Sequence, residues 1–277
     1  MSGAAGRPTQ GSADARNRRG PSASSGGLPA ATLARVFLRS FFLQAAWNPR
    51  GMQNLGFAHA MAPALAALYP DPKARARATA RHLELFNCHP YLAAGILGAA
   101  VRLEEQVAHG EIPEERASAL KQVLAPPFAA LGDGFFWLAL RPAAALLAAV
   151  TVPALGLWSL VVFLGLYNAL HLGARLWLFV EGYCRGEGIV EAIAHAHLPW
   201  ATALLKVSGA LLAGILAARS LLVALAPAQA GAPPRVGHAA LVAATIVGMV
   251  AILPHLRFAA ALYFSLALGL AIGSGFF

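Results

Sequence analysis

Charged residues are scarce in this sequence. Only 12% of the 277 residues are Asp, Glu, Lys or Arg, whereas soluble domains carry about 25%. Hydrophobic residues make up 58%, so much of the surface must face something other than water. These proportions indicate an integral membrane protein and exclude an ordinary soluble globular domain.

Several long windows lack charge almost entirely, which makes them candidates for membrane spans. A helix crosses a bilayer with roughly 20 residues. The windows of about that length or longer, of which only the second contains a charged residue (Arg219), are residues 142–174, 207–227, 236–256 and 258–277. We therefore expect an all-α integral membrane protein with about four conventional transmembrane helices in residues 142–277.

Cysteines and catalytic motifs are also few. The two cysteines, Cys88 and Cys184, have no CxxC spacing, so neither a disulfide framework nor a zinc site is indicated. No phosphate-binding GxxxxGK[ST], HExxH, GxSxG or dinucleotide fingerprint occurs. His195 and His197 form an HxH pair without an obvious third ligand, and the alternative is an interfacial loop. We expect no catalytic residues, no metal and no cofactor.

Positive charge is concentrated near the N-terminus. Residues 1–81 hold 11 of the 21 basic residues and only two acids, whereas the remainder is balanced. The first thirty residues have no apolar core, so they predict a disordered basic tail (1–30) and not a secretory signal peptide. The positive-inside rule places this side in the cytoplasm. Binding of nucleic acid by a basic arm is the rival interpretation, and we do not expect it.

Residues 31–141 mix polar and apolar segments and predict broken or re-entrant helices. Asn48 and Pro49 suit a helix start, and Pro63 should kink or break that helix. A second helix approaching from Thr79 should break near Cys88, because Pro90 disfavours helical geometry in the preceding residue, and should resume at Tyr91. Irregular backbone at membrane depth is tolerated where it lines a cavity or is buried in protein.

Two further segments interrupt the apolar pattern. Residues 102–122 predict a soluble helical insert, made of two short charged helices around a turn at 110–113. Residues 175–191 predict a polar loop between spans. The domain division expected from these patterns is a tail (1–30) and a membrane domain (31–277), which consists of the broken region (31–141) and the transmembrane helices (142–277).

Several polar side chains in the broken region are candidates for binding a substrate. Amides donate and accept hydrogen bonds as paired sugar hydroxyls require, and a tryptophan ring suits the C–H face of a sugar. Each candidate also has a structural interpretation: the amides cap or bridge helices, the histidine satisfies carbonyls freed by the following proline, and the aspartate lies in a Gly-Asp-Gly turn. The candidates are Trp47, Asn48, Gln53, Asn54, His89 and Asp133.

Four segments carry a resemblance to a known family. They are RSFFLQAAWNPRGMQNLGF (39–57), RHLELFNCHPYLAAGILGAAVRLEEQ (81–106), LGDGFFWLALRP (131–142) and GYCRGEGI (182–189). In order and rough spacing they resemble the IID component of the mannose/fructose/sorbose-type phosphotransferase system. The resemblance covers roughly residues 33–277 and leaves only the tail unexplained.

The resemblance implies a multi-pass subunit of a sugar permease in the bacterial cytoplasmic (inner) membrane. It implies a IIC membrane partner, soluble IIA and IIB phosphocarriers, and a higher oligomer of the IIC–IID pair. Phosphoryl transfer is then expected on IIB, so this chain is not expected to be an enzyme. The family motifs contain all six candidates for sugar binding. The alternative is a membrane-bound regulatory or scaffolding relative that binds phosphotransferase components without transporting sugar.

Overall fold

The computed structural model describes residues 27–225, and in that range regular structure is helical, as the sequence predicts. Two isolated β-bridges join Asn48 to Met52 and Met52 to Phe86. The expected tail falls largely outside the described residues, as do the candidate spans 236–256 and 258–277. The elements are α1 (Ala30–Arg39), η1 (Ser40–Phe42), α2 (Asn54–Leu68), α3 (Pro72–His82), α4 (Ala93–Ala108), α5 (Glu114–Gly132), η2 (Asp133–Leu140), α6 (Arg141–Leu155), α7 (Trp158–Arg185), η3 (Gly186–Gly188), α8 (Ile189–His195) and α9 (Leu198–Leu225).

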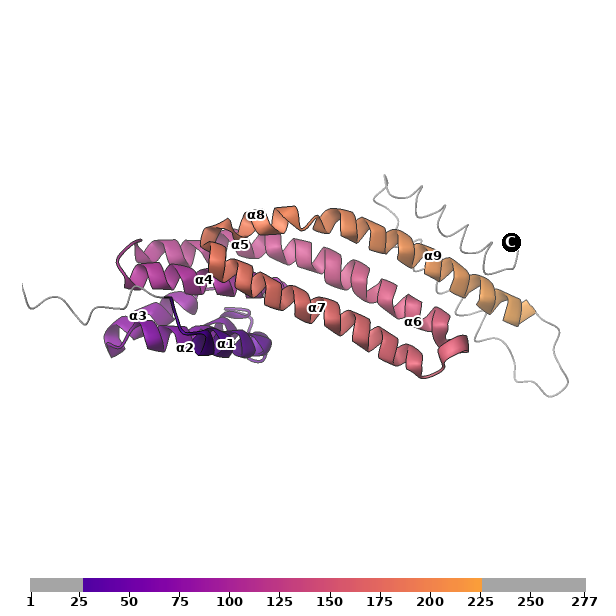
Figure 1. Cartoon of the computed structure of the whole chain (residues 1–277), viewed down its shortest axis with the longest axis horizontal. Helices are drawn as coiled ribbons and strands as arrows, with labels where there is room; N and C mark the ends of the chain where they lie inside the picture. Colours follow the sequence, from indigo (N-terminus) through magenta and orange to yellow (C-terminus); the bar gives the residue numbers. More distant parts are fainter. Residues whose placement is uncertain (1–26, 226–277) are drawn as a thin grey trace, which may run out of the picture.

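The molecule is elongated (Figure 1). Helices α1 to α4 gather at one end, where the first half of α5 and the C-terminal half of α7 join them. Helices α6, α7 and α9 extend together toward the other end, with α6 in contact with both of its neighbours. The chain reverses at η3 and α8, so α9 runs back beside α6.

Two helical segments are apolar and long enough to cross a membrane. They are Glu114–Leu155, which joins α5, η2 and α6, and Trp158–Ser220, which includes α7 to α9. Large apolar side chains lie on the outside of these helices, including Trp158, Leu160 and Trp200. An exposed apolar surface of this kind suits contact with lipid or with another membrane helix. The number of spans stays a prediction.

Helix α4 forms the centre of the core, and it approaches α7 closely. Nearly every residue from Ala93 to Glu105 is buried. A methyl group at Gly98 would collide with the carbonyl oxygen of Phe179, and one at Gly182 would collide with that of Gly95. Small residues therefore allow the two backbones to meet, which is how helices commonly associate in membranes.

The expected start of the first broken helix is wrong, and the proline expected to kink or break this helix does not end it. The helix begins at Asn54 and not at Asn48, and Pro63 lies inside it without ending it. Pro63 has no N–H for the carbonyl of His59, four residues earlier. Arg39 donates to that carbonyl at 3.4 Å instead. The arginine therefore supplies a hydrogen bond to the carbonyl that the proline cannot satisfy.

The second break is confirmed but is wider than expected. Helix α3 ends at His82 and α4 begins at Ala93, so the irregular segment 83–92 contains Cys88, His89 and Pro90. The predicted turn at 110–113 is present, with Gly110 at φ +75°. The helices beside it are longer than expected, however, because α5 continues into η2 and α6. The boundary expected between 141 and 142 thus falls inside one helical segment.

One of the two interpretations of Asp133 is wrong, and so is the expectation of a polar loop. The Gly-Asp-Gly turn is absent, because Asp133 begins the π-helix η2 within a continuous helical segment. The polar loop at 175–191 is mostly helical, because α7 continues to Arg185 and α8 follows after η3. Charged side chains in that segment are therefore spaced along helices and not along a loop.

Candidate functional site

The candidate site is centred on two irregular segments that pair with each other, residues 43–53 and 83–92, which we call the paired loops. The backbone N–H of Gln53 donates to Phe86 at 2.9 Å, and that of Phe86 donates to Gly51 at 3.3 Å. Met52 adopts a positive φ of 57°, which is unusual for a residue with a side chain. This turn brings Met52 into bridges with both Asn48 and Phe86.

The carboxamide of Gln53 joins the paired loops in the interior. Its Nε2 donates to the carbonyl of Cys88 at 2.8 Å, and its Oε1 accepts from the backbone N–H of Cys88 at 3.0 Å. Both residues are buried. The side chain therefore satisfies both backbone groups of a residue that lies outside any helix, which buried backbone requires.

Asn48 and Asn54 stabilise the outer part of the paired loops. Asn48 Oδ1 accepts from the backbone N–H of Arg50 at 3.2 Å and of Gly51 at 2.8 Å, so it stabilises a turn and does not cap a helix. Its Nδ2 donates to Asn54 Oδ1 at 3.0 Å. Asn54 in turn donates to the carbonyl of Leu83 at 2.6 Å.

These amides account for carbonyls that the break before Pro90 leaves without helical partners. The side chain of Asn54 donates to the carbonyl of Leu83. The side chain of Gln53 donates to the carbonyl of Cys88, and its backbone N–H donates to that of Phe86. Gln122 from α5 donates to the carbonyl of Leu85 at 3.1 Å. Amide groups thus satisfy the freed carbonyls, which was the structural role considered for His89. The histidine ring is left for another contact.

His89 lies between the paired loops and the π-helix. Its ring stacks on Phe136, with centroids 5.2 Å apart and planes at 13°, and meets the edges of Tyr91 and Trp137. A methyl group at Gly132 would collide with the Cβ and ring of His89. The glycine before the π-helix therefore makes room for the histidine. Stretches of π-helix are frequent at functional sites.

The protonation of His89 follows from its surroundings. Burial lowers its pKa to about 4, and the positive charge of Arg175 adds to this effect, so the ring is neutral at neutral pH. Nδ1 faces the backbone N–H of Tyr91 at 3.3 Å and accepts from it. The proton consequently lies on Nε2. That N–H donor is buried and has no hydrogen-bond partner among the described residues.

Asp133 lies close to the paired loops. It follows Gly132, which touches His89, and it is half-buried. Burial raises the pKa of the Cys88 thiol, and the carboxylate of Asp133 adds to that shift. Within residues 27–225 the Asp133 side chain has no ion pair. The structure thus brings Gln53, His89 and Asp133 around Cys88.

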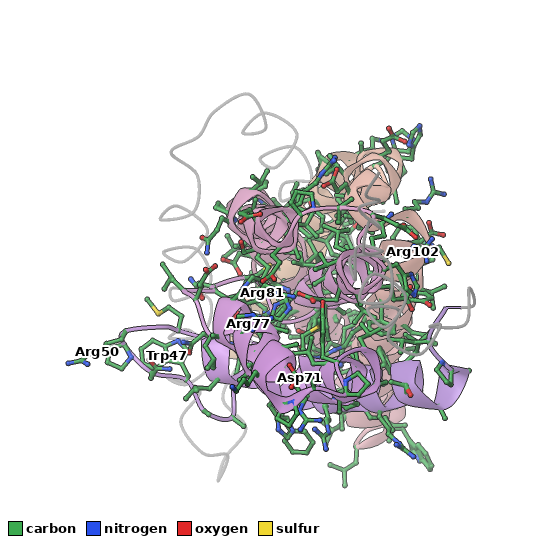
Figure 2. The ribbon with its side chains drawn as sticks, turned by 90° about the vertical axis from the view of Figure 1, so that its left-hand side faces the viewer. Trp47, Arg50, Asp71, Arg77, Arg81 and Arg102 are labelled. Atoms are coloured by element: carbon green, nitrogen blue, oxygen red, sulfur yellow. The ribbon has the colours of Figure 1, made fainter. Side chains whose placement is uncertain are left out.

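Trp47 is separate from this group. Its side chain is 55% exposed, and Figure 2 shows it beside Arg50 in a loop that projects from one edge of the molecule. The indole is therefore available to an external partner, whereas the neighbouring amides point inward to backbone groups.

A polar row on α7 was missed by sequence reasoning. Tyr167 and His171 pack against Tyr91, with the Tyr91 and His171 rings stacked 4.4 Å apart. Arg175 donates to the carbonyl of Ser40 and lies 4.2 Å above the ring of Phe41. The spacing of four residues between Tyr167, His171 and Arg175 places them on one helix face, and this signal was present in the sequence.

The guanidinium of Arg175 is buried without a carboxylate among its described contacts. Its partner is the carbonyl of Ser40 at the C-terminal end of α1, where the helix dipole is negative. Arg175 therefore connects the end of α1 to α7 by a hydrogen bond.

A buried ionic cluster joins α3 to α4. Glu104 accepts from Arg81 at 2.7 and 2.6 Å, from His82 at 2.8 Å and from Tyr69 at 2.8 Å. Burial alone would raise the pKa of Glu104, but the hydrogen bonds from Arg81 and His82 outweigh burial and lower it to about 2. Burial lowers the pKa of His82 despite its bond to Glu104, so His82 is a neutral donor. Lys121 donates to the carbonyl of Arg81 at 2.5 Å.

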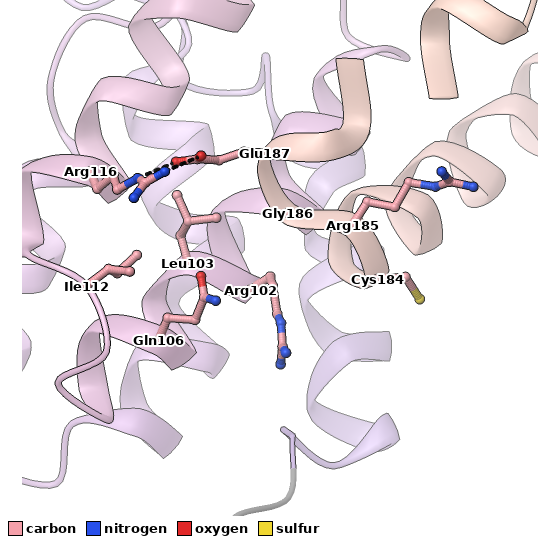
Figure 3. Close-up of a pocket in the computed structure, with 9 residues that line it drawn as sticks. All are labelled: Arg102, Leu103, Gln106, Ile112, Arg116, Cys184, Arg185, Gly186 and Glu187. Carbon is pink, nitrogen blue, oxygen red and sulfur yellow. Dashed lines mark hydrogen bonds and ion pairs between the residues drawn. The ribbon is translucent and has the colours of Figure 1, made fainter. Parts of the chain in front are cut away.

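A cavity of about 320 Å³ opens between the ends of α4 and α7 and the start of α5 (Figure 3). Arg116 crosses it to donate to Glu187 at 2.8 and 2.7 Å. Arg102 and Arg185 line it with their stems, and their guanidinium groups point away from that pair. The cavity therefore does not gather positive charge at one point. No cluster of three or more metal-ligating side chains occurs within residues 27–225.

Comparisons with known proteins identify relatives of the whole described region. Residues 28–256 match the sequence profile of the "PTS system mannose/fructose/sorbose family IID component". The chain is 42% identical over 158 residues to the "PTS system mannose-specific EIID component" of Escherichia coli (strain K12), covering 56% of each protein. It is 34% identical over 160 residues to the "Fructose permease IID component" of Bacillus subtilis (strain 168), covering 57% of this chain and 58% of the relative.

These alignments span little more than half the length of the curated relatives. Solved structures extend the likeness. One, described as "Structure of membrane protein", has a TM-score of 0.64 and 29% identity over 90% of this chain and 98% of its own. Another is a chain from the cryo-EM structure of the mannose transporter ManYZ with microcin E492, with a TM-score of 0.55 and 30% identity over 90% and 96%.

Proposed function

Because the chain belongs to the mannose/fructose/sorbose family of IID components of the phosphotransferase system (PTS), we propose that it translocates a mannose-type hexose together with a IIC subunit. In this proposal, soluble IIA and IIB carriers bring the phosphoryl group, and IIB phosphorylates the sugar on the cytoplasmic side. Phosphorylation traps the sugar in the cell. The chain is a transporter subunit and does not itself transfer the phosphoryl group.

Several comparisons support parts of this proposal. The mannose-specific relative supports the choice of hexose, and the likeness to a chain of the ManYZ complex supports a membrane partner. The two long apolar segments support a multi-pass subunit of the bacterial inner membrane. The basic excess in residues 1–81 supports a cytoplasmic N-terminal tail. A higher oligomer of the IIC–IID pair is part of the same proposal.

The observation that carries the sugar site is the unused donor of His89. Its Nε2–H is buried and has no described partner, and such a group is costly unless a bound molecule or partner supplies an acceptor. A sugar hydroxyl is an acceptor of the right kind, and the nearby rings of Trp137 and Tyr91 offer apolar faces. The half-buried carboxylate of Asp133 can accept from a neighbouring hydroxyl.

The remaining candidates take complementary roles in the proposal. Gln53 and Asn54 already bond to backbone groups, so they position the paired loops and each has one N–H left to donate. Asn48 does the same at the rim. Trp47 is exposed on a projecting loop apart from His89, so in this proposal it reaches the sugar only from a surface that the IIC subunit covers. Transport then moves the sugar together with the region that holds it.

The experiment is phosphoenolpyruvate-dependent uptake of labelled mannose. Cells without their own mannose system express the IIC and IIB partners with or without this chain. The proposal predicts accumulation of mannose phosphate only when the chain is present. Assembly of the chain with IIC but no uptake above background would favour the regulatory alternative, and equal uptake without the chain would contradict transport by it.

A further inference from the structure

Helix α3 carries positive charge that nothing in the described structure neutralises. Its sequence, PKARARATARH, contains no acidic residue. The side chains of Lys73, Arg75 and Arg77 form no ion pair and no hydrogen bond within residues 27–225, and those of Lys73 and Arg77 are exposed. Figure 2 looks onto this end of the molecule and labels Arg77 together with Asp71, the residue that precedes α3.

The helix is held rigidly at both ends. Asp71 caps its start by accepting from the backbone N–H groups of Lys73 and Ala74 at 3.3 and 3.0 Å. At its end, Arg81 and His82 turn inward to the buried carboxylate of Glu104. The basic side chains between these anchors therefore project from a fixed backbone. A rigid charged surface loses less conformational entropy when a partner binds.

The composition of α3 favours a soluble partner over a membrane surface as what this helix binds. A helix that lies in a bilayer interface needs large apolar side chains on one face, but the apolar residues of α3 are alanines and Pro72 only. Figure 1 also places α3 at the end of the molecule far from the turn between α6 and α7. If α6 and α7 cross the bilayer, α3 projects beyond it into water.

We propose that α3 is the docking surface for the acidic face of a water-soluble partner, and that Lys73, Arg75 and Arg77 guide its approach. This inference rests on the proposed function, in which the soluble partner is the phosphorylated IIB carrier. Complementary charge raises association rates by about 10–10³-fold and loses this effect as salt increases. The buried cluster around Glu104 keeps the docking surface in place.

The test measures association of phosphorylated IIB with the purified complex of this chain and IIC. The double variant Lys73→Glu/Arg77→Glu should slow association about tenfold or more at low salt, and the difference should shrink at high salt. Affinity for mannose and the thermal midpoint should not change, because neither side chain has a described contact. The matched single variants are Arg77→Glu and Arg35→Glu, because Arg35 is also exposed and unpaired among described residues but lies on α1. Only Arg77→Glu should slow association.

Three results would overturn the docking surface. They are unchanged association in the double variant, an equal effect from Arg35→Glu, and a defect that appears only with vesicles rich in phosphatidylglycerol, which would make α3 a lipid contact. Failure of the proposed function is a separate result, because it appears as absent mannose uptake in wild-type cells. Association of IIB is measured without transport, so the two outcomes are distinguishable.

Discussion

Replacing Gln53 with alanine should destabilise the protein by breaking the connection between the paired loops. The substitution leaves the N–H and the carbonyl of Cys88 without the partners that lie at 3.0 and 2.8 Å. Cys88 is only 3% exposed, so bulk solvent does not reach these two groups. Each unsatisfied buried group costs about 1–3 kcal/mol, which gives a total of about 2–6 kcal/mol.

The assay is the thermal midpoint of the chain in its complex with IIC, solubilised in mild detergent. For a protein of this size, 1 kcal/mol corresponds to roughly 2–4 °C, so we expect Gln53→Ala to lower the midpoint by about 5 °C or more. Gln44→Ala is the matched control, because Gln44 is exposed in the same loop region and its side chain has no described hydrogen bond. The control should shift the midpoint by less than about 2 °C.

The two roles of Gln53 predict different results. If Gln53→Ala shifts the thermal midpoint no more than Gln44→Ala does while mannose affinity falls, Gln53 contacts the sugar and does not connect the loops. If the midpoint falls as expected, lost mannose affinity follows from displaced loops. A normal midpoint together with normal affinity would refute both roles.

Two further predictions concern packing and the ionic cluster. Gly182→Ala should lower the thermal midpoint, because the added methyl group meets the carbonyl of Gly95 and overpacking costs about 1–3 kcal/mol. Gly173→Ala is the control: this residue lies on an open face of the same helix, so the substitution should leave the midpoint unchanged or raise it slightly. Equal effects of the two substitutions would contradict the close contact between α4 and α7. The pKa of Glu104 is lowered from its usual 4.5 to about 2. Above pH 4.5 the ionised carboxylate therefore stabilises the fold by about 3 kcal/mol. This stabilisation is lost as the pH falls from about 4.5 to about 2. Glu104→Gln should therefore lower the thermal midpoint at neutral pH and make its decline in acid shallower. If the midpoints of the variant and the wild type fall in parallel as the pH is lowered, this account is contradicted.

The broken region shows what local sequence patterns can predict. Pro90 correctly predicted a break, because the steric effect of proline acts on its immediate neighbour. The start at Asn48 was wrong because the choice depends on pairing between segments distant in sequence. Asn48 forms a turn that lets Met52 pair with Phe86, and no local propensity predicts that contact. Likewise, Arg39 donates from another helix to the carbonyl of His59, which Pro63 leaves without its helical partner.

The candidate site was predicted in part for the same reason. The amide cluster stood out because polar side chains are unusual in an apolar chain, but their partners are backbone groups of residues 83–92. One interpretation placed Asp133 in a turn because glycines flank it. Gly132 instead permits close packing, since a side chain at this position would collide with His89. Arg175 was placed in the predicted polar loop, whereas it lies within α7 and its buried guanidinium donates to the carbonyl of Ser40.

The central claim is that this chain contributes the His89 donor to a sugar site. The most direct measurement is equilibrium binding of labelled mannose to the purified complex with IIC, for wild type and His89→Phe. Phenylalanine keeps the stacking on Phe136 and removes the Nε2–H. Because one hydrogen bond is worth about 0.5–1.5 kcal/mol, the account predicts that mannose binds about two- to tenfold more weakly to an otherwise intact complex. Unchanged mannose affinity in the assembled His89→Phe complex would contradict it.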